Sequence, residues 1–226
     1  TRLTVGGPGD VIDLVYAIQV PSIANNGAVI KVTANDRVGN VAELLLDDGA
    51  RPVILREHTG RADPDLPTDL DNANTPPGPP LRATDPALFE TRLEWNADSL
   101  CTRVVHPNAN ETLFTYDQLN PDRRAQGNLL SVTRLPGPLG ADQPIITEQW
   151  QYDPILNFGT NLVTRHTDER GHDTVFIYDP QGSVVHITHR IPSIVEDFQH
   201  NAFGQLTRHV LPDNGSGSRR EDAFTY

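Results

Sequence analysis

Apolar and polar residues alternate along much of this chain, in short runs separated by turn-forming residues. In residues 10–20 apolar side chains recur at every second position, the period of a β-strand with one apolar face. The runs 28–34 and 41–46 alternate in the same way, and Asn25-Asn26-Gly27 between the first two is a typical turn sequence. We therefore predict a β-meander of about three strands within residues 1–57.

Residues 58–90 lack this period and are rich in proline and aspartate. Such a composition predicts a linker or a long draped loop. Aspartates at odd-numbered positions in this stretch offer oxygen ligands of the kind that wrap calcium. The candidate calcium ligands are Asp63, Asp65, Asp69 and Asp71. Because the stretch lacks the central glycine and closing glutamate of an EF-hand, a solvated acidic linker is the alternative interpretation.

Residues 91–226 repeat one phrase six times. Each copy has an apolar residue and a ring two positions apart on a strand, followed in most copies by Asp or Asn, a turn and a second strand. The two members of each pair share a strand face, the Asp or Asn oxygen caps the turn, and glycine supplies backbone angles that other residues reach only at a cost. The repeat-defining residues are Trp95, Phe114, Tyr116, Asp117, Trp150, Tyr152, Asp153, Phe176, Tyr178, Asp179, Gly182, Phe198, Gly204, Phe224 and Tyr226.

A two-stranded unit cannot bury its apolar face alone, so neighbouring units must pair edge to edge. We therefore predict an all-β fold of antiparallel hairpins, with the rings packed in ladders across adjacent strands. Phe176 and Phe224 are expected to be buried. In one unit His200-Asn201 stands where the others have Tyr-Asp, and we predict looser packing there.

The segment Tyr178-Asp179-Pro180-Gln181-Gly182-Ser183-Val184 resembles a unit of the RHS/YD-repeat family, whose pattern begins Tyr-Asp-x-x-Gly-x-Leu. The resemblance extends over residues 91–226. Members include bacterial Rhs and toxin-complex shell proteins and teneurin-like receptors. It implies that this chain forms part of a spiralling β-ribbon shell, preceded by the short meander. Residues 32–43 also resemble the closing strands of bacterial immunoglobulin-like modules.

The family resemblance carries expectations about function and location. It implies a structural segment of a large secreted or cell-surface protein, whose shell encloses or presents a C-terminal effector. Its partners would be the remainder of its own longer chain, including that effector. The chain contains no Met and begins with Thr1, which favours a piece of a longer product.

Charge limits the other partners. The formal net charge is -12, which disfavours nucleic acid and anionic lipid because both are bound through basic patches. No apolar run approaches the roughly 18 residues of a membrane helix, so we expect no membrane insertion by this segment.

The sequence shows no nucleophile elbow, phosphate loop or dinucleotide fingerprint, so we expect no enzymatic activity. Cys101 lies within a predicted strand, where a buried apolar thiol is expected rather than a nucleophile. Asp179-Pro180 resembles a self-cleavage site, but it lies in an ordinary repeat turn.

His186 and His189 have opposite parity and should face opposite sides of the sheet, whereas a cross-strand pair of His166 with His186 is a candidate metal site. Apart from calcium, no cofactor is expected.

Two functions remain open from the sequence. The first is the non-enzymatic shell segment described above. The alternative is an extracellular binding or adhesion module that recognises a glycan or a protein through exposed aromatic residues. Burial separates them, since rings packed within the ribbon favour a wall and several rings exposed in one patch favour binding.

Overall fold

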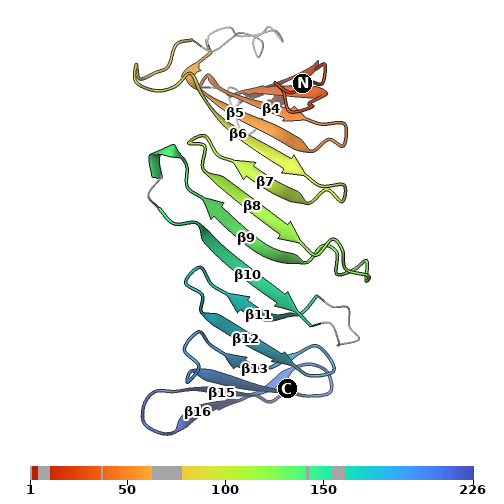
Figure 1. The fold of residues 1–226 in the computed structure, drawn as a ribbon, viewed down its shortest axis with the longest axis vertical. Coiled ribbons are helices and arrows are strands. Elements are labelled where there is room, and N and C mark those ends of the chain that lie inside the picture. Colours follow the sequence, from red (N-terminus) through yellow and green to blue (C-terminus); the bar gives the residue numbers. More distant parts are fainter. Residues whose placement is uncertain (1, 5–10, 37, 63–77, 141–142, 154–160) are drawn as a thin grey trace. The chain divides into compact units, whose positions relative to one another are not determined.

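A computed structural model of the 226-residue chain describes residues 2–4, 11–36, 38–62, 78–140, 143–153 and 161–226. Within these ranges the chain is all-β, with sixteen strands and one short 3-10 turn, η2 (Pro138–Gly140). The strands follow one another across the sheet in sequence order, and paired strands run antiparallel (Figure 1). The predicted all-β antiparallel fold class is confirmed. In the described ranges no helix is long and apolar enough to cross a membrane.

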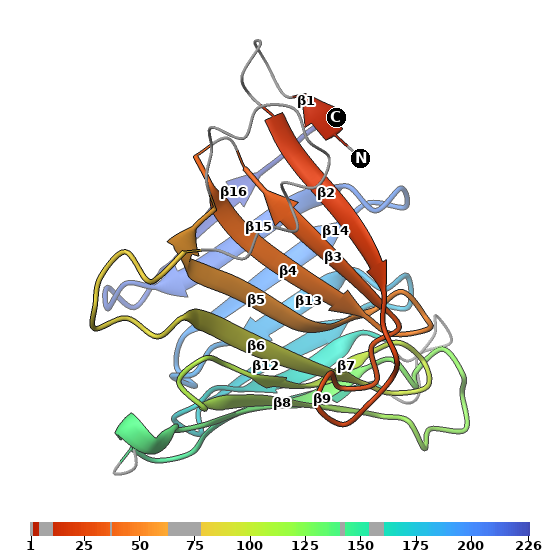
Figure 2. The ribbon, with the colours of Figure 1, turned by 90° about the horizontal axis from the view of Figure 1, so that it is seen from above.

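The chain divides into two compact units, Thr1–Glu111 with Pro136–Asp142, and Thr112–Leu135 with Gln143–Tyr226. The strands of the first unit are β1 (Arg2–Thr4), β2 (Val11–Ile18), β3 (Ile30–Asn35), β4 (Asn40–Leu46), β5 (Pro52–Arg61), β6 (Leu88–Trp95) and β7 (Cys101–Val105). Figure 2 shows β2 to β6 side by side in this order. Strands β2, β3 and β4 coincide with the three strands predicted for the meander.

Both ends of the predicted linker are strands. β5 continues to Arg61 and β6 begins at Leu88, and the two pair directly, with Arg56 opposite Glu90. The polar residues on both faces of β5 conceal its strand character in the sequence. Of the remaining stretch, residues 63–77 lie outside the described ranges. The candidate calcium ligands Asp63, Asp65, Asp69 and Asp71 are among them, so the calcium site stays a prediction.

The buried core of the first unit is small. Ala28, Leu45, Val53 and Ile54 are buried together, and Trp95 packs against them. Leu45 and Ile54 lie directly opposite each other on β4 and β5. Leu45, Val53 and Ile54 lie on either side of the turn between β4 and β5, so this cluster occupies one end of the sheet. Val41 and Ala62, at the other end, are buried outside it.

The apolar face predicted for residues 10–20 is exposed at its C-terminal end. Tyr16, Ile18 and Val20 share that face and are 59%, 92% and 85% exposed, whereas Ile12 and Leu14 are half-buried. Within the first unit the described strands belong to one sheet, and β2 packs mainly against its neighbours β1 and β3.

The second unit consists of hairpins. Its strands are β8 (Glu111–Tyr116), which begins at the boundary, β9 (Leu129–Leu135), β10 (Ile146–Tyr152), β11 (Val163–Thr167), β12 (Asp173–Tyr178), β13 (Val184–Thr188), β14 (Val195–His200), β15 (Leu206–Asp213) and β16 (Arg219–Ala223). Strand β16 ends before the last predicted ring pair, and Phe224 and Tyr226 are 41% and 75% exposed. The expectation that Phe224 is buried is wrong, because β16 is the last strand in the sheet order and no described strand covers its outer side.

Candidate functional site

The repeated feature of this molecule is the turn that joins its strands. At the end of a strand, an Asp or Asn accepts hydrogen bonds through Oδ1 from the backbone amides two and four residues later. For Asp179 the donors are Gln181 and Ser183, each at 2.9 Å. Six such caps, each followed three positions later by a left-handed residue, are Asp36, Asp47, Asn96, Asp168, Asp179 and Asn201. Asp213 accepts from Gly215 and Gly217 in the same way.

The residue three positions after the cap adopts a left-handed backbone. Gly182 and Gly204 have φ angles of 87° and 76°, which glycine reaches without steric cost. In two capped turns of the first unit another residue stands there: Ala50 and Ser99 have φ angles of 58° and 61°. Ala109, in the turn that follows His106, also has a φ angle of 58°. A side chain costs about 1–2 kcal/mol in this conformation, so these turns hold strain that the glycine turns avoid.

The ring before the capping residue is tied to the preceding strand. The Tyr178 hydroxyl on β12 donates to the carbonyl of Val163, the first residue of β11, at 2.7 Å. The Tyr152 hydroxyl on β10 does the same to Leu129, the first residue of β9, at 3.0 Å. Burial raises the pKa of both tyrosines, so both hydroxyls keep their protons and remain donors at neutral pH.

In the first unit an indole makes the same connection. The Trp95 Nε1–H on β6 donates to the carbonyl of Pro52, the first residue of β5, at 2.7 Å. At all three places the ring residue coincides with a shift in strand register, as at Ile177/Tyr178. The shift and the hydrogen bond together direct the polar end of the ring toward the neighbouring strand.

The other ring of each pair faces the following strand. Trp150 lies opposite His166 of β11 and stacks on it, with ring centroids 5.0 Å apart. Phe198 lies opposite His209 of β15 and stacks at 4.6 Å. Trp150 and Tyr152 therefore connect β10 to the strands on both of its sides. Apart from Phe224 and Tyr226, the predicted rings are half-buried on the sheet. The expectation that Phe176 is buried is therefore wrong as well.

His200 occupies the ring position of β14 without making this connection. Its Nδ1 is buried and has no hydrogen-bond partner among the described residues. The corresponding carbonyl belongs to Val184, the first residue of β13. The looser packing predicted for this unit stays a prediction.

Exchanging rings at these positions should change stability in opposite directions. We expect Tyr178→Phe to lower the free energy of unfolding by about 1 kcal/mol, because it removes the hydrogen bond to Val163. We expect His200→Tyr to raise it by about 1 kcal/mol, because the new hydroxyl can reach Val184 and the unpaired nitrogen is removed. Urea denaturation followed by far-UV circular dichroism measures both. Tyr226→Phe, at an exposed position, is the control and should have no effect; a loss in His200→Tyr would contradict the proposed equivalence.

Two of the predicted capping residues begin longer loops instead of tight turns. The Asp117 amide donates to the carbonyl of Asn128, and its carbonyl accepts from Asn120. The Asp153 amide donates to the carbonyl of Leu162. The loop after Asp117 contributes to the long interval between the rings of β8 and β10, whereas the loop after Asp153 follows the ring of β10.

Charged side chains form a ladder across the first unit. Glu43 on β4 contacts Lys31 on β3 at 2.8 Å and Arg56 on β5 at 3.5 Å, and Arg56 contacts Glu90 on β6 at 2.7 Å. The sign of the charge alternates from strand to strand. Burial opposes the ionisation of Glu43 and Glu90, but hydrogen bonds from the basic neighbours outweigh it and hold both pKa values below the usual range.

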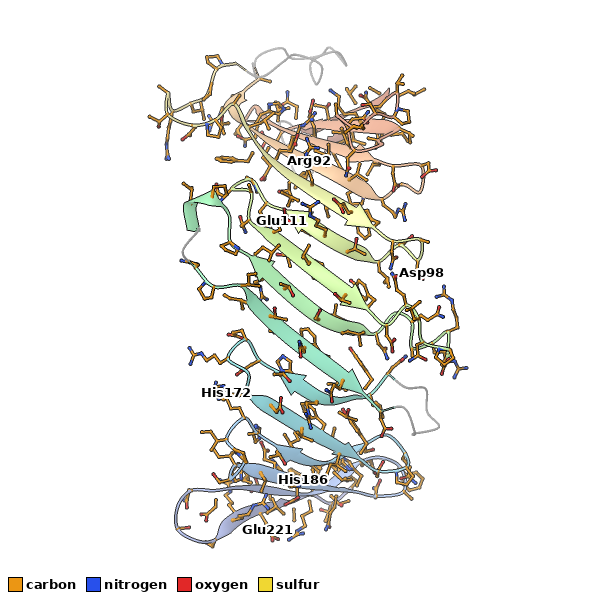
Figure 3. The ribbon with its side chains drawn as sticks, in the orientation of Figure 1. Arg92, Asp98, Glu111, His172, His186 and Glu221 are labelled. Carbon is orange, nitrogen blue, oxygen red and sulfur yellow. The ribbon has the colours of Figure 1, made fainter. Side chains whose placement is uncertain are left out.

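The ladder continues at the edge of the same unit. Arg103 on β7 lies between Glu94 on β6 at 2.7 Å and Glu111 at the start of β8 at 2.6 Å. Figure 3 labels Arg92 and Glu111 on these strands. Since like charges opposite each other are destabilising, the alternation favours one register over its neighbours.

Histidines take the basic positions around β14 in the second unit. Glu196 binds His189 at 2.7 Å and His209 at 2.5 Å, while Asp197, the next residue, binds His186 at 2.5 Å and also Arg219. Adjacent residues on a strand face opposite sides, so the two clusters lie back to back. Figure 3 labels His186 on β13. The predicted opposite orientation of His186 and His189 is confirmed.

The candidate metal pair of His166 and His186 is wrong. His166 lies opposite Thr174 on β12, and His186 lies opposite Ile177 on the same strand. Thr174 and Ile177 are three residues apart, so their side chains face opposite sides of the sheet. The two histidines are therefore on opposite faces of the sheet. Among the residues that the structure describes, no group of three or more His, Cys, Asp or Glu is arranged to hold a metal ion.

The carboxylates of β14 predict an acid-sensitive stability. For Glu196 burial acts against ionisation, but the His209 and His189 hydrogen bonds outweigh it; for Asp197 the His186 hydrogen bond is the largest effect, and Arg219 adds to it. Both pKa values are lowered, so their stabilising contribution is complete above the unfolded pKa values of about 4. It is lost as the pH falls through the lowered folded values.

We therefore expect the free energy of unfolding to be steady down to about pH 4.5 and to fall steeply toward about pH 3. Urea denaturation at a series of pH values checks this. Glu196→Gln should make the free energy of unfolding less dependent on pH in this acid range, because the replaced group no longer binds a proton on unfolding. An unchanged acid limb would show that other carboxylates dominate.

The first unit contains capped turns of the same kind as the repeats, which the spacing of the ring pairs does not indicate. Asp36 and Asp47 use the same turn as Asp179, although they lie in the predicted meander and not in the predicted repeats. The signal was present in the sequence as Asp36-x-x-Gly39 and Asp47-x-x-Ala50. The repeat pattern places a ring before the capping residue, and Leu46 stands in that position before Asp47. The second of these turns therefore does not match the pattern.

The comparison with known structures agrees with this geometry. The chain superposes on TcdB2-TccC3 with a TM-score of 0.59 at 14% sequence identity, covering 96% of this chain and 10% of that one. Further matches are TcdB2-TccC3-TEV, with a TM-score of 0.46, 10% identity and coverage of 92% and 12%, and a Photorhabdus luminescens Tc holotoxin pore, with a TM-score of 0.39, 13% identity and coverage of 79% and 9%. No family model and no curated protein sequence matches the chain.

At this level of identity the likeness to TcdB2-TccC3 concerns the fold alone. The chain has the antiparallel β fold of a segment of a toxin-complex protein and spans about a tenth of that protein's length.

Proposed function

We propose that this chain is a stretch of wall in an RHS/YD-repeat β-ribbon, and that its function is structural. The observation that carries the proposal is a repeated hydrogen bond between neighbouring strands. The hydroxyl or indole N–H of a ring residue on one strand donates to the carbonyl of the first residue of the preceding strand. A connection of this kind serves to join successive strands. It is made by Trp95, Tyr152 and Tyr178.

The small number of fully buried side chains among the described residues supports the same function. A domain that folds alone needs a closed hydrophobic core. A segment of wall instead needs side chains that are paired with one another on both faces of the sheet, and edge strands that pair with further strands. The described side chains are arranged in this way, with rings and charges paired across strands and few residues fully buried. The fold shared with TcdB2-TccC3 supports the same proposal.

The finer proposal concerns the whole protein. We propose that the ribbon belongs to a large secreted or cell-surface protein, that it encloses or presents a C-terminal effector, and that its main partner is the remainder of its own chain. We propose no catalytic role for this segment. Its carboxylates and histidines are engaged with one another across strands, as with Glu196 between His189 and His209.

Selective labelling of the two faces tests the wall. Thr164 and Arg165 are neighbours on β11 and face opposite sides. In the full gene product, with the native thiol removed by Cys101→Ser, we expect a 5 kDa polyethylene glycol maleimide to modify only one of the variants Thr164→Cys and Arg165→Cys. A small maleimide, the matched control, should modify both. Equal modification of both by the large reagent would overturn enclosure, and a gene product no longer than this chain would overturn the proposal altogether.

The second candidate function is an extracellular binding module. It is favoured by the exposed apolar residues at one edge of the first unit, where Tyr16, Ile18, Val20 and Ile23 follow one another within eight residues. An exposed apolar group of this kind is unusual on a monomer surface and marks interaction sites.

A further inference from the structure

The first unit contains a solvent-open hollow of about 380 Å³ at the core end of its sheet. The lining residues are Asn26, Gly27, Asp47, Arg51, Val53, Leu93, Glu94 and Trp95. They come from three places in the sequence: the turn before β3, the turn between β4 and β5, and the end of β6. Of these lining residues, the proposed wall function uses only Trp95, through its bond to Pro52.

The structure holds the lining in place. Asn26 Nδ2 donates to the carbonyls of Val53 and Leu93 at 3.4 and 3.1 Å. Arg51 donates through Nε to Asp47 at 2.8 Å and through Nη1 to the Asn96 carbonyl at 3.0 Å. Trp95 is fixed by its bond to Pro52 and by packing on the core. The groups therefore require little ordering when a ligand binds.

The charges of the lining identify the class of ligand. Arg51 is paired with Asp47, and Glu94 is paired with Arg103, so the hollow offers neither an unpaired cation for a phosphate nor an unpaired carboxylate cluster for a metal. What remains is an indole beside planar polar groups, namely an amide, a guanidinium and two carboxylates. Planar groups of this kind hydrogen-bond neighbouring hydroxyls in pairs, and an indole packs on the apolar face of a sugar ring.

We propose that this hollow binds a single neutral sugar residue of a glycan, with Trp95 packing on the ring and Asn26, Arg51 and Glu94 contacting its hydroxyls. This inference does not depend on the wall function. A ligand of about twelve heavy atoms in an open site binds with a dissociation constant of about 1–10 mM. Affinity for a glycan surface would then come from several copies.

Tryptophan fluorescence tests the site directly, because the chain has two tryptophans and Trp150 lies in the other unit. In Trp150→Phe only Trp95 reports. We expect a saturable change on titration with at least one of the methyl glycosides of glucose, galactose and mannose or with N-acetylglucosamine. Glycerol at equal hydroxyl concentration is the control for a solvent effect. No saturation by about 100 mM, or an equal response to glycerol, would overturn the proposal.

A matched pair of variants locates the binding. Glu94→Ala and Glu111→Ala each remove one of the two carboxylates on Arg103, but only Glu94 lines the hollow. We expect Glu94→Ala to weaken binding at least fivefold and Glu111→Ala to leave it unchanged. Indole resonances of the unmodified chain give an independent reading that needs no variant. A sugar-dependent shift of the Trp150 indole without a shift of the Trp95 indole would place the site elsewhere and overturn the proposal.

Discussion

Ile54→Ala is expected to lower the free energy of unfolding by about 3–4 kcal/mol. The Ile54 side chain is 0% exposed and lies opposite Leu45 in the largest buried contact of the first unit. Truncation removes the buried apolar surface and leaves a cavity, because backbone strands on both sides limit collapse. Urea denaturation in the Trp150→Phe background, followed by the fluorescence of Trp95, measures the loss in the unit where it occurs.

Ile18→Ala is the matched control for this substitution. It makes the same chemical change on β2, where Ile18 is 92% exposed, and should change the free energy of unfolding by less than about 0.5 kcal/mol. Equal losses at the two positions would mean that the face of β2 is covered in solution. A loss below about 1 kcal/mol at Ile54 would contradict the assignment of the core to this end of the sheet.

Gly39→Ala is expected to cost about 3 kcal/mol, for two reasons that add. Gly39 has a φ angle of 83°, where an alanine is strained. A Cβ at this position would also lie 2.4 Å from the carbonyl oxygen of Ala62. The backbone at residue 62 must then move, which breaks the 2.9 Å hydrogen bond from the Ala62 amide to the Gly39 carbonyl.

Gly204→Ala separates the two effects. Gly204 has a similar φ angle of 76°, in the turn between β14 and β15, but a Cβ there would meet nothing within 4 Å. We expect a loss of about 1 kcal/mol, from the backbone conformation alone. Thermal and urea denaturation of the two variants measure the difference. Similar losses would show that the contact between the turn at Gly39 and the end of β5 is unimportant.

Local chemistry was readable from the sequence. Alternation with period two predicted the strands of the meander and of the hairpins, because the period is a property of the extended backbone itself. Asp179 and Gly182 were recognised as a turn for a similarly local reason, since the cap and the left-handed residue act on amides within four residues. The opposite orientation of His186 and His189 followed from parity alone.

The pairing partners were not readable. The carbonyls bonded by Tyr178 and Trp95 lie 15 and 43 residues earlier in the chain, and nothing near either ring in the sequence indicates them. The alternating face of β2 was correct as a pattern, but burial depends on whether another layer covers it. The prediction that Phe224 is buried was wrong for a related reason. A ring becomes buried only when its strand has a neighbouring strand on each side.

The hollow beside Trp95 shows this limit most clearly. Asn26, Arg51 and Glu94 are far apart in the sequence, and none belongs to a recognisable motif. They meet because β4, β5 and β6 are paired in one particular register, which brings two turns and a strand end to the same place. The charge ladder from Lys31 to Glu90 depends on the same register.

By itself, therefore, the sequence determined the period, the turns and the repetition, which together define an antiparallel β protein built from hairpins. These properties depend on interactions within a few residues, and a few residues carry enough information to specify them. Only the tertiary structure decided which strand each ring connects to, which face remains open and which distant side chains form a hollow. Those outcomes depend on strand register and on the layers present, and both arise from the whole sheet rather than from any one segment of it.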